Sequence, residues 1–190
     1  MKKATIALLL ICTAAFAQEE GTFTDSRDKK KYKTVKIGEQ TWMAENLNHD
    51  AKGSKCYGNK PANCKKYGKL YDWETAMEAC PSGWHLPSVN EWKALDDFVG
   101  GEDVAWGKLK AKSGWNEDGN GTDEFGFSAL PGGGGGGRGG GIGRIGFWWS
   151  ANERNSLNAY ARFIDNFDSE DSFWDEYEKS TLFSVRCVMN

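Results

Sequence analysis

The sequence predicts an α+β domain in which two helices pack on antiparallel sheets, with long irregular loops and two disulfides. The first helix is indicated by Trp73, Ala76, Met77 and Cys80, which follow the i, i+3, i+4, i+7 spacing of one helical face, with Asp72 as the expected cap. The sheets are indicated by the C-terminal third, where short aromatic and apolar runs alternate with turn residues. The disulfides are indicated by an even number of cysteines after a candidate export signal.

Residues 1–17 have the order of regions found in a secretory signal peptide. Lys2 and Lys3 precede an apolar run over residues 4–15, and small residues flank the expected cleavage site after Ala17. This run is shorter than the ~20 apolar residues that span a bilayer, and no later stretch approaches that length, so no transmembrane segment is expected. We therefore expect secretion to the bacterial periplasm, the outer surface or the extracellular space.

Residues 18–31 are polar and are expected to form a linker, which leaves residues 32–190 as one domain. Nine tryptophans and an aromatic content of 13% provide material for a single core. Because the formal net charge is −3, nucleic acid is not an expected partner.

Four cysteines remain after the expected cleavage, and an exported chain with this number predicts two disulfides. The sequence is compatible with three pairings. We favour Cys56 with Cys64, which closes a short loop, and Cys80 with Cys187, which ties the junction of the two helices to the last strand. A zinc site is not expected, because the chain has no Cys-x-x-Cys pair.

The second predicted helix follows a turn that contains two prolines and a glycine. Ser88 and Glu91 have the spacing of a capping box, so the helix is expected to begin at Val89. It is expected to end at Val99, because Gly100 can supply the left-handed conformation that closes many helices. Its expected buried face comprises Val89, Trp92, Leu95 and Val99.

Strands are predicted on both sides of the helix pair. Residues 32–37 and 40–43 flank Gly38 and Glu39, which fit a two-residue hairpin turn with glycine in its first position. Residues 46–67 are expected to be irregular. Further strands are expected at residues 125–130, 147–150, 158–164, 172–177 and 182–188.

The segment after the helices is rich in oxygen ligands. Residues 116–121 resemble the first half of an EF-hand calcium loop. Phe127 occupies the position where an EF-hand requires a glutamate, so an EF-hand is excluded. A looser calcium site formed by Asp118, Asn120 and Asp123 is the weaker alternative, because a network of side-chain turns explains the same residues without metal. No cofactor is expected.

Residues 132–146 form a glycine-rich loop. No helix is predicted directly after it and no Gly-Lys-Ser or Gly-Lys-Thr occurs in it, so a nucleotide-binding loop is not indicated. Glycine loses the most backbone freedom on ordering, so we expect this loop to contribute little to ligand binding.

The strands that follow carry the predicted ligand contacts. Acidic and aromatic residues alternate between residues 165 and 178, and aromatic rings can cover sugar rings while polar groups bind hydroxyls. Polysaccharide is preferred as the partner over a surface protein. The candidate contacts are Arg154, Asn158, Tyr160, Arg162, Asp165, Asn166, Trp174 and Tyr177.

Five blocks of sequence, in order, closely resemble the Fibrobacter succinogenes major paralogous domain family, from about residue 32 to residue 190. They are VKIGEQTWMAENLN, KYGKLYDWETAMEACPSGWHLPSVNEW, GTDEFGFSALPGG, FWWSANE and FSVRCV. This resemblance implies a C-type lectin-like fold, related to that of formylglycine-generating enzymes and of the variable proteins of diversity-generating retroelements. A lectin-like fold does not by itself imply sugar binding.

The leading functional hypothesis is a non-catalytic ligand-binding module, secreted or on the cell surface. A structural surface or matrix protein is the main alternative. An oxidase like the formylglycine-generating enzymes would need reactive cysteines close together, and only Cys187 lies near the C-terminal strands. A hydrolase using paired carboxylates is less favoured, because nothing specifies an acid and a base.

Overall fold

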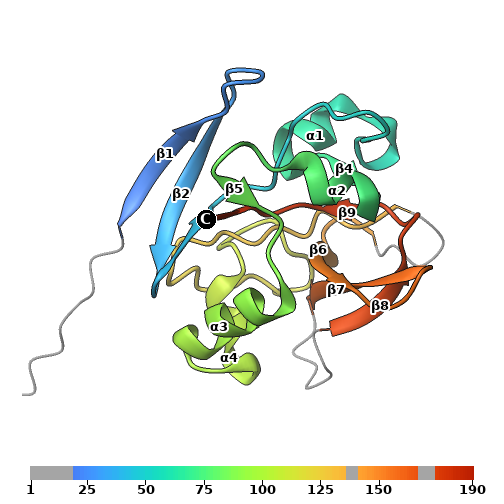
Figure 1. Ribbon diagram of the computed structural model, residues 1–190. Helices are drawn as coiled ribbons and strands as arrows, with labels where there is room; N and C mark the ends of the chain where they lie inside the picture. Colours follow the sequence, from blue (N-terminus) through green and yellow to red (C-terminus); the bar gives the residue numbers. More distant parts are fainter. Residues whose placement is uncertain (1–18, 136–140, 167–173) are drawn as a thin grey trace, which may run out of the picture.

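The computed structural model describes residues 19–135, 141–166 and 174–190 (Figure 1). The expected signal peptide, residues 1–17, lies outside the described residues. Within the described ranges, two five-stranded sheets and four α-helices make up the fold, so the α+β class is confirmed. Most strand pairs are antiparallel, as expected, but β6 and β9 pair in parallel. No helix in the described part of the chain is long and apolar enough to cross a membrane.

The first sheet has the order β1-β2-β3-β10-β5, and the second has the order β4-β9-β6-β7-β8. The strands of the first sheet are β1 (Glu20–Thr24), β2 (Lys31–Ile37), β3 (Gln40–Met43), β5 (Trp84–His85) and β10 (Val188–Met189). Those of the second sheet are β4 (Leu70–Tyr71), β6 (Ile145–Glu153), β7 (Asn158–Asp165), β8 (Trp174–Glu178) and β9 (Phe183–Ser184). The helices are η1 (Tyr57–Asn59), α1 (Pro61–Tyr67), α2 (Trp73–Ala79), α3 (Val89–Val99) and α4 (Glu102–Leu109).

The two predicted helices are confirmed together with their caps. Asp72 accepts a hydrogen bond from the Thr75 amide at the start of α2, and Ser88 and Glu91 form the full capping box of α3. Gly100 has a φ of 118° and closes α3, as expected. Met77 is an exception, because it is exposed and does not join the buried face of α2.

Three features differ from the expectations for the N-terminal and central segments. The expected linker contains β1, which pairs with β2 through partners such as Phe23 and Tyr32. Helices α1 and α4 were not predicted. The strand expected at residues 125–130 is wrong, because only Ala129 makes a bridge there, to Lys110.

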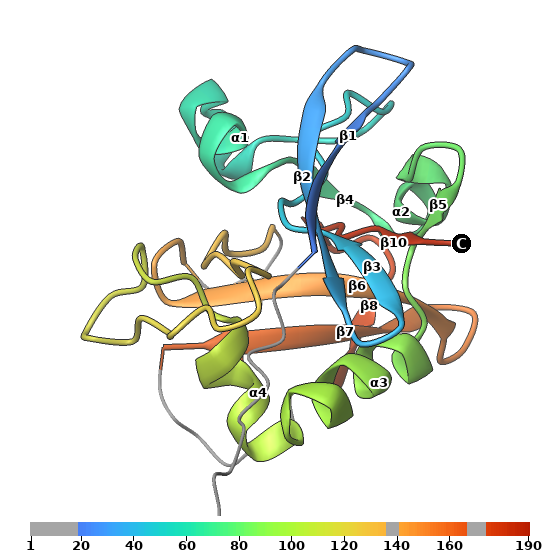
Figure 2. The ribbon, with the colours of Figure 1, turned by 90° about the vertical axis from the view of Figure 1, so that its left-hand side faces the viewer.

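The central strand of the second sheet, β6, is buried on both faces. Phe147 and Trp149 of β6 belong to one buried cluster, which includes Trp73 of α2. Trp148, between them, points to the other cluster, which includes Trp92 of α3. Figures 1 and 2 both show this sheet between α1 and α2 on one side and α3 and α4 on the other.

The two favoured disulfides, Cys56–Cys64 and Cys80–Cys187, are confirmed. The last predicted strand is split: β9 belongs to the second sheet and β10 to the first. Residues 185–187 join them, and Cys187 is fully buried. The Cys80–Cys187 bridge therefore fastens the end of α2 to the segment that connects the two sheets.

Candidate functional site

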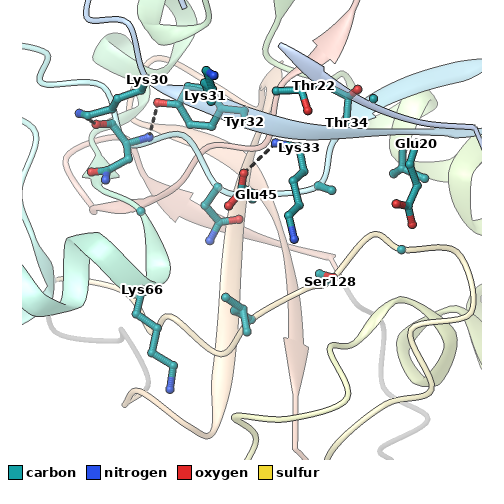
Figure 3. Close-up of a pocket in the computed structure, with 18 of the residues that line it drawn as sticks. Glu20, Thr22, Lys30, Lys31, Tyr32, Lys33, Thr34, Glu45, Lys66 and Ser128 are labelled. Carbon is teal, nitrogen blue, oxygen red and sulfur yellow. Dashed lines mark hydrogen bonds between the residues drawn. The ribbon is translucent and has the colours of Figure 1, made fainter. Parts of the chain in front are cut away.

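A groove of about 840 Å³ lies between the β1–β2 ribbon, α1 and the loop at residues 123–130 (Figure 3). Its wall is polar and charged. The lining residues with polar side chains include Glu20, Thr22, Lys30, Lys31, Tyr32, Lys33, Thr34, Glu45, Asn46, Asn48, Lys65, Lys66, Asp123 and Ser128. We call this cavity the hairpin groove.

Asn46 belongs to the lining of the hairpin groove and is buried. Its amide nitrogen donates to the Tyr67 carbonyl at 2.9 Å and to the Ser184 hydroxyl at 3.3 Å. Its carbonyl oxygen accepts from Trp148 Nε1 at 2.8 Å. The same oxygen accepts from Arg186 Nε at 3.0 Å and from a terminal guanidinium nitrogen at 2.8 Å. Asn46 thus connects the lining of the groove to the buried residues Trp148 and Arg186 through hydrogen bonds.

Arg186 lies directly behind Asn46 and is fully buried. Its other hydrogen bonds go to the Phe127 carbonyl at 2.6 Å and the Met43 carbonyl at 3.2 Å, and its guanidinium carbon is 4.5 Å from the Phe127 ring centroid. No carboxylate forms an ion pair with it in the described ranges. Burial lowers the pKa of Arg186 to about 9, which still leaves the group charged at neutral pH.

Two of the acidic residues in the groove lining already accept hydrogen bonds from the protein. Glu45 accepts from the Lys33 backbone amide at 2.7 Å. Asp123 accepts from the Ser128 amide at 2.7 Å and from the Ser128 hydroxyl at 2.6 Å. These carboxylates therefore support the loop and the strand that shape the groove.

The turn of the β1–β2 ribbon is held by a second charged cluster. Asp25 is fully buried, and its two carboxylate oxygens both accept from the Arg27 guanidinium, which also donates to the Ala79 carbonyl at 2.9 Å. Asp28 accepts from Lys30 and lies 3.1 Å from His49 Nδ1. Oxygen and nitrogen atoms of Asp25, Asp28 and His49 lie within 4.8 Å of one another, as metal ligands could. The Arg27 guanidinium already donates hydrogen bonds to both carboxylate oxygens of Asp25. We therefore interpret the cluster as an ion-pair network that orients the ribbon over the groove.

This network predicts a pH-dependent stability. Burial alone would raise the pKa of Asp25, but hydrogen bonds from Arg27 outweigh burial and the net shift is downward. A lowered folded-state pKa gives stability that is present above the ordinary pKa of about 3.9 and is lost as pH falls through the lower folded value. We expect Asp25→Asn to cost about 1.5–3 kcal/mol at pH 7, and the difference to shrink towards pH 2.

Thermal unfolding of the parent and the variant between pH 2 and pH 8 checks this prediction. Asp118→Asn is the matched control, because Asp118 is exposed, and it should leave the melting temperature within about 1 °C, as surface substitutions usually do. A constant difference between Asp25→Asn and the parent over the whole pH range would contradict the role of the Asp25 charge.

The predicted contact residues on β7 and β8 are divided among different environments. Arg162 is fully buried and forms an ion pair with Asp96 of α3, so it is a core residue and not a surface contact. Trp174 is half-buried and packs against the cluster that contains Trp92. Tyr177 packs on the opposite face, with ring centroids 5.6 Å from Phe147 and 4.9 Å from Phe183.

The other predicted contacts lie towards the two ends of β7. Arg154 is exposed and pairs with Glu176 at 3.2 Å, and Asn158 and Tyr160 are partly exposed near it. Asp165 and Asn166 are at the far end, where Asn166 donates to Glu117 at 3.0 Å. The structure therefore does not gather the eight residues into one surface.

The three weak calcium candidates are also separated. Asp118 and Asn120 line a second cavity of about 720 Å³, whereas Asp123 lines the hairpin groove. Asn120 accepts from the Trp115 amide at 3.1 Å, and Asp123 is bound to Ser128. These hydrogen bonds fit the predicted network of side-chain turns.

The hairpin groove was not predicted from the sequence. Its lysines come from the expected linker, from β2 and from an unpredicted helix, so their proximity depends on the fold. One available signal was the alternation of Lys31 and Lys33, which places both on one face of a strand.

These features define a disulfide-bonded α+β domain with a polar groove between a strand ribbon and a short helix. The Fibrobacter succinogenes major domain family model matches residues 35–189, and the chain belongs to that family. The match begins within β2, so β1 and the first part of β2 precede it. No curated protein and no solved structure matched the chain.

Proposed function

We propose that this chain is an exported, non-catalytic module with a C-type lectin-like fold that binds a polysaccharide in the hairpin groove. The observation that carries this proposal is the groove itself, whose volume of about 840 Å³ is in the range of ligand-binding cavities. Hydroxyl, amide and charged side chains line it, and such groups form the hydrogen bonds that orient a sugar chain. The two disulfides are consistent with an oxidising compartment.

The chemistry of the described residues favours binding over catalysis. Cys56, Cys64, Cys80 and Cys187 are all bridged, so they do not offer the free thiols that an oxidase of the formylglycine-generating type would use. In the groove, Glu45 and Asp123 hold backbone and hydroxyl groups of the protein. Their hydrogen bonds give them a structural role that does not require a reaction.

The groove also fits a ligand better than the β7–β8 hairpin, on which the sequence hypothesis was based. Trp174 and Tyr177 pack into the two buried clusters, one on each face of the sheet. Neither ring is a free platform for a sugar, because much of its surface already contacts the core. By contrast, Thr22, Lys33 and Lys66 of the groove lining are exposed and can meet a ligand without leaving the core.

Obstruction of the groove tests this proposal. Thr22 lies on exposed β1 and lines the groove, and Thr22→Trp should reduce affinity for the bound polysaccharide at least tenfold while leaving the melting temperature unchanged. Thr24→Trp, on the same strand but outside the lining, is the matched control and should change affinity less than threefold. The ligand is first found with a panel of soluble and insoluble cell-wall polysaccharides, and isothermal titration calorimetry then gives each dissociation constant.

The outcomes separate the alternatives. If Trp174→Ala abolishes binding in a folded protein and Thr22→Trp does not, the ligand binds on the β7–β8 hairpin. If the folded parent binds nothing in the panel and self-associates, the structural surface protein is favoured. Release of new reducing ends from the bound polysaccharide would contradict the non-catalytic part of the proposal.

A further inference from the structure

The hairpin groove carries more positive than negative side chains, although the chain as a whole has a formal net charge of −3. Three acidic residues line it, namely Glu20, Glu45 and Asp123. Five lysines line it, namely Lys30, Lys31, Lys33, Lys65 and Lys66. The groove is therefore a local positive region on an acidic protein.

Most of these lysines are not neutralised by neighbours. Lys30 lies 3.4 Å from Asp28 and also donates to the Asn48 carbonyl. The remaining four form no ion pair within the residues that the structure describes. Figure 3 shows Lys33 extending from the β1–β2 ribbon towards the loop that carries Ser128, and Lys66 extending from α1 on another side of the groove. Two walls of the groove thus carry cations.

The buried guanidinium of Arg186 adds to this positive region. It has no ion-pair partner among the described residues, and it donates two hydrogen bonds to Asn46, which lines the groove. Glu45 and Asp123 are the acidic groups that act on its charge, and both are in the groove lining. Because charges in a low-dielectric interior are screened less than surface charges, the field of this guanidinium extends into the groove.

We infer that the hairpin groove binds an anionic polysaccharide, whose acidic groups pair with the lysines of β2 and α1 while its hydroxyls bind Thr22, Thr34 and Ser128. This inference rests on the proposed function and specifies its ligand class. A polymer with a charge on each sugar matches a groove with cations on two walls better than a neutral chain does, because a neutral chain would leave the lysines unpaired. Glu20 opposes anions at one end and favours a ligand that also offers hydroxyl donors.

The experiment uses the full mature chain and four defined polymers. Polygalacturonic acid carries carboxylates, dextran sulfate carries sulfates, and dextran and xyloglucan are neutral. We expect the parent to bind at least one of the two acidic polymers at least tenfold more tightly than either neutral polymer. We also expect affinity to fall at least tenfold between 0.05 and 0.5 M NaCl, because salt screens the exposed lysines.

Charge removal identifies the site. The double variant Lys33→Gln with Lys66→Gln should weaken binding to the acidic polymer at least tenfold without changing the melting temperature. The control is Lys36→Gln with Lys93→Gln, which removes two exposed lysines outside the groove lining and should change affinity less than threefold. A preference for polygalacturonic acid or for dextran sulfate supports the inference in either case and shows which acidic group is bound.

Failure of the inference can be distinguished from failure of the proposed function. If a neutral polymer binds as tightly as the acidic ones and Thr22→Trp blocks it, the groove is a polysaccharide site but the anionic ligand class is wrong. If Lys36→Gln with Lys93→Gln weakens binding as much as the groove variant, the attraction is non-specific and the inference is overturned. If none of the four polymers nor any polysaccharide of the wider panel binds, both proposals fail.

Discussion

Replacing Cys80 and Cys187 by alanine is expected to lower the melting temperature by about 10–20 °C. The bridge spans 107 residues, and loop closure of that length contributes about 4.7 kcal/mol by restricting the unfolded chain. For a domain of this size each kcal/mol corresponds to about 2–4 °C. The bridge also holds the end of α2 to the fully buried Cys187, so its loss loosens the segment that joins the two sheets.

The second disulfide is the control for this prediction. Cys56 and Cys64 are only eight residues apart, so their bridge is worth about 2.5 kcal/mol, or about 5–10 °C, in the same treatment. Differential scanning calorimetry of the two double-alanine variants measures both effects. An equal or larger loss for the Cys56–Cys64 variant would show that chain entropy does not dominate the stabilisation by either bridge.

The features that the sequence predicted well are those encoded by neighbouring residues. Ser88 and Glu91 are three residues apart and complete their capping box within one helical turn, so the start of α3 does not depend on the rest of the fold. The hairpin around Gly38 is equally local, because Ile37 pairs directly with Gln40. Its glycine has a φ of 60°, a conformation that other residues rarely adopt.

The features that were missed depend on distant partners. β1 has a polar sequence, and it is a strand because it pairs with β2 and because Phe23 contacts Trp84, with ring centroids 5.2 Å apart. The N-cap residue of α4 is Gly101, which has no side chain to cap the helix, so α4 lacks the local signal that indicated α3. Neither element is specified by its own residues alone.

The hairpin groove illustrates the same limit for function. Asn46 is polar and precedes Leu47 in a segment expected to be irregular, and nothing local shows that it binds Arg186, which is 140 residues away. The ligand contacts were predicted on aromatic, polar and charged residues of the C-terminal strands. Alternation identified the two faces of those strands, but it could not show that Trp174 on one face and Tyr177 on the other both pack against buried clusters.

Arg162 was predicted to contact ligand, but it is fully buried and forms an ion pair with Asp96. Asp96→Ala is expected to destabilise the domain by about 3–5 kcal/mol, because the buried Arg162 guanidinium would lose its ion pair with Asp96. The guanidinium carbon lies 5.4 Å from the Trp92 ring centroid, a contact that cannot replace a carboxylate. Urea unfolding followed by tryptophan fluorescence measures the change in the free energy of unfolding.

Substitution of the partner residue, Arg162→Met, should lower the free energy of unfolding by less than Asp96→Ala does, and the loss should depend on pH. Burial raises the pKa of Asp96, and without Arg162 nothing comparable would oppose burial, so the carboxyl group can become neutral by taking up a proton. Arg162→Met should therefore regain stability as pH falls from 8 to 5, whereas Asp96→Ala should not, because that variant has no carboxyl group at this position to take up a proton. The double variant should be more stable than Asp96→Ala, since a methionine fills the space next to Trp92 without a buried charge. Equal losses for both single variants at every pH would show that packing, and not charge, accounts for the role of this pair.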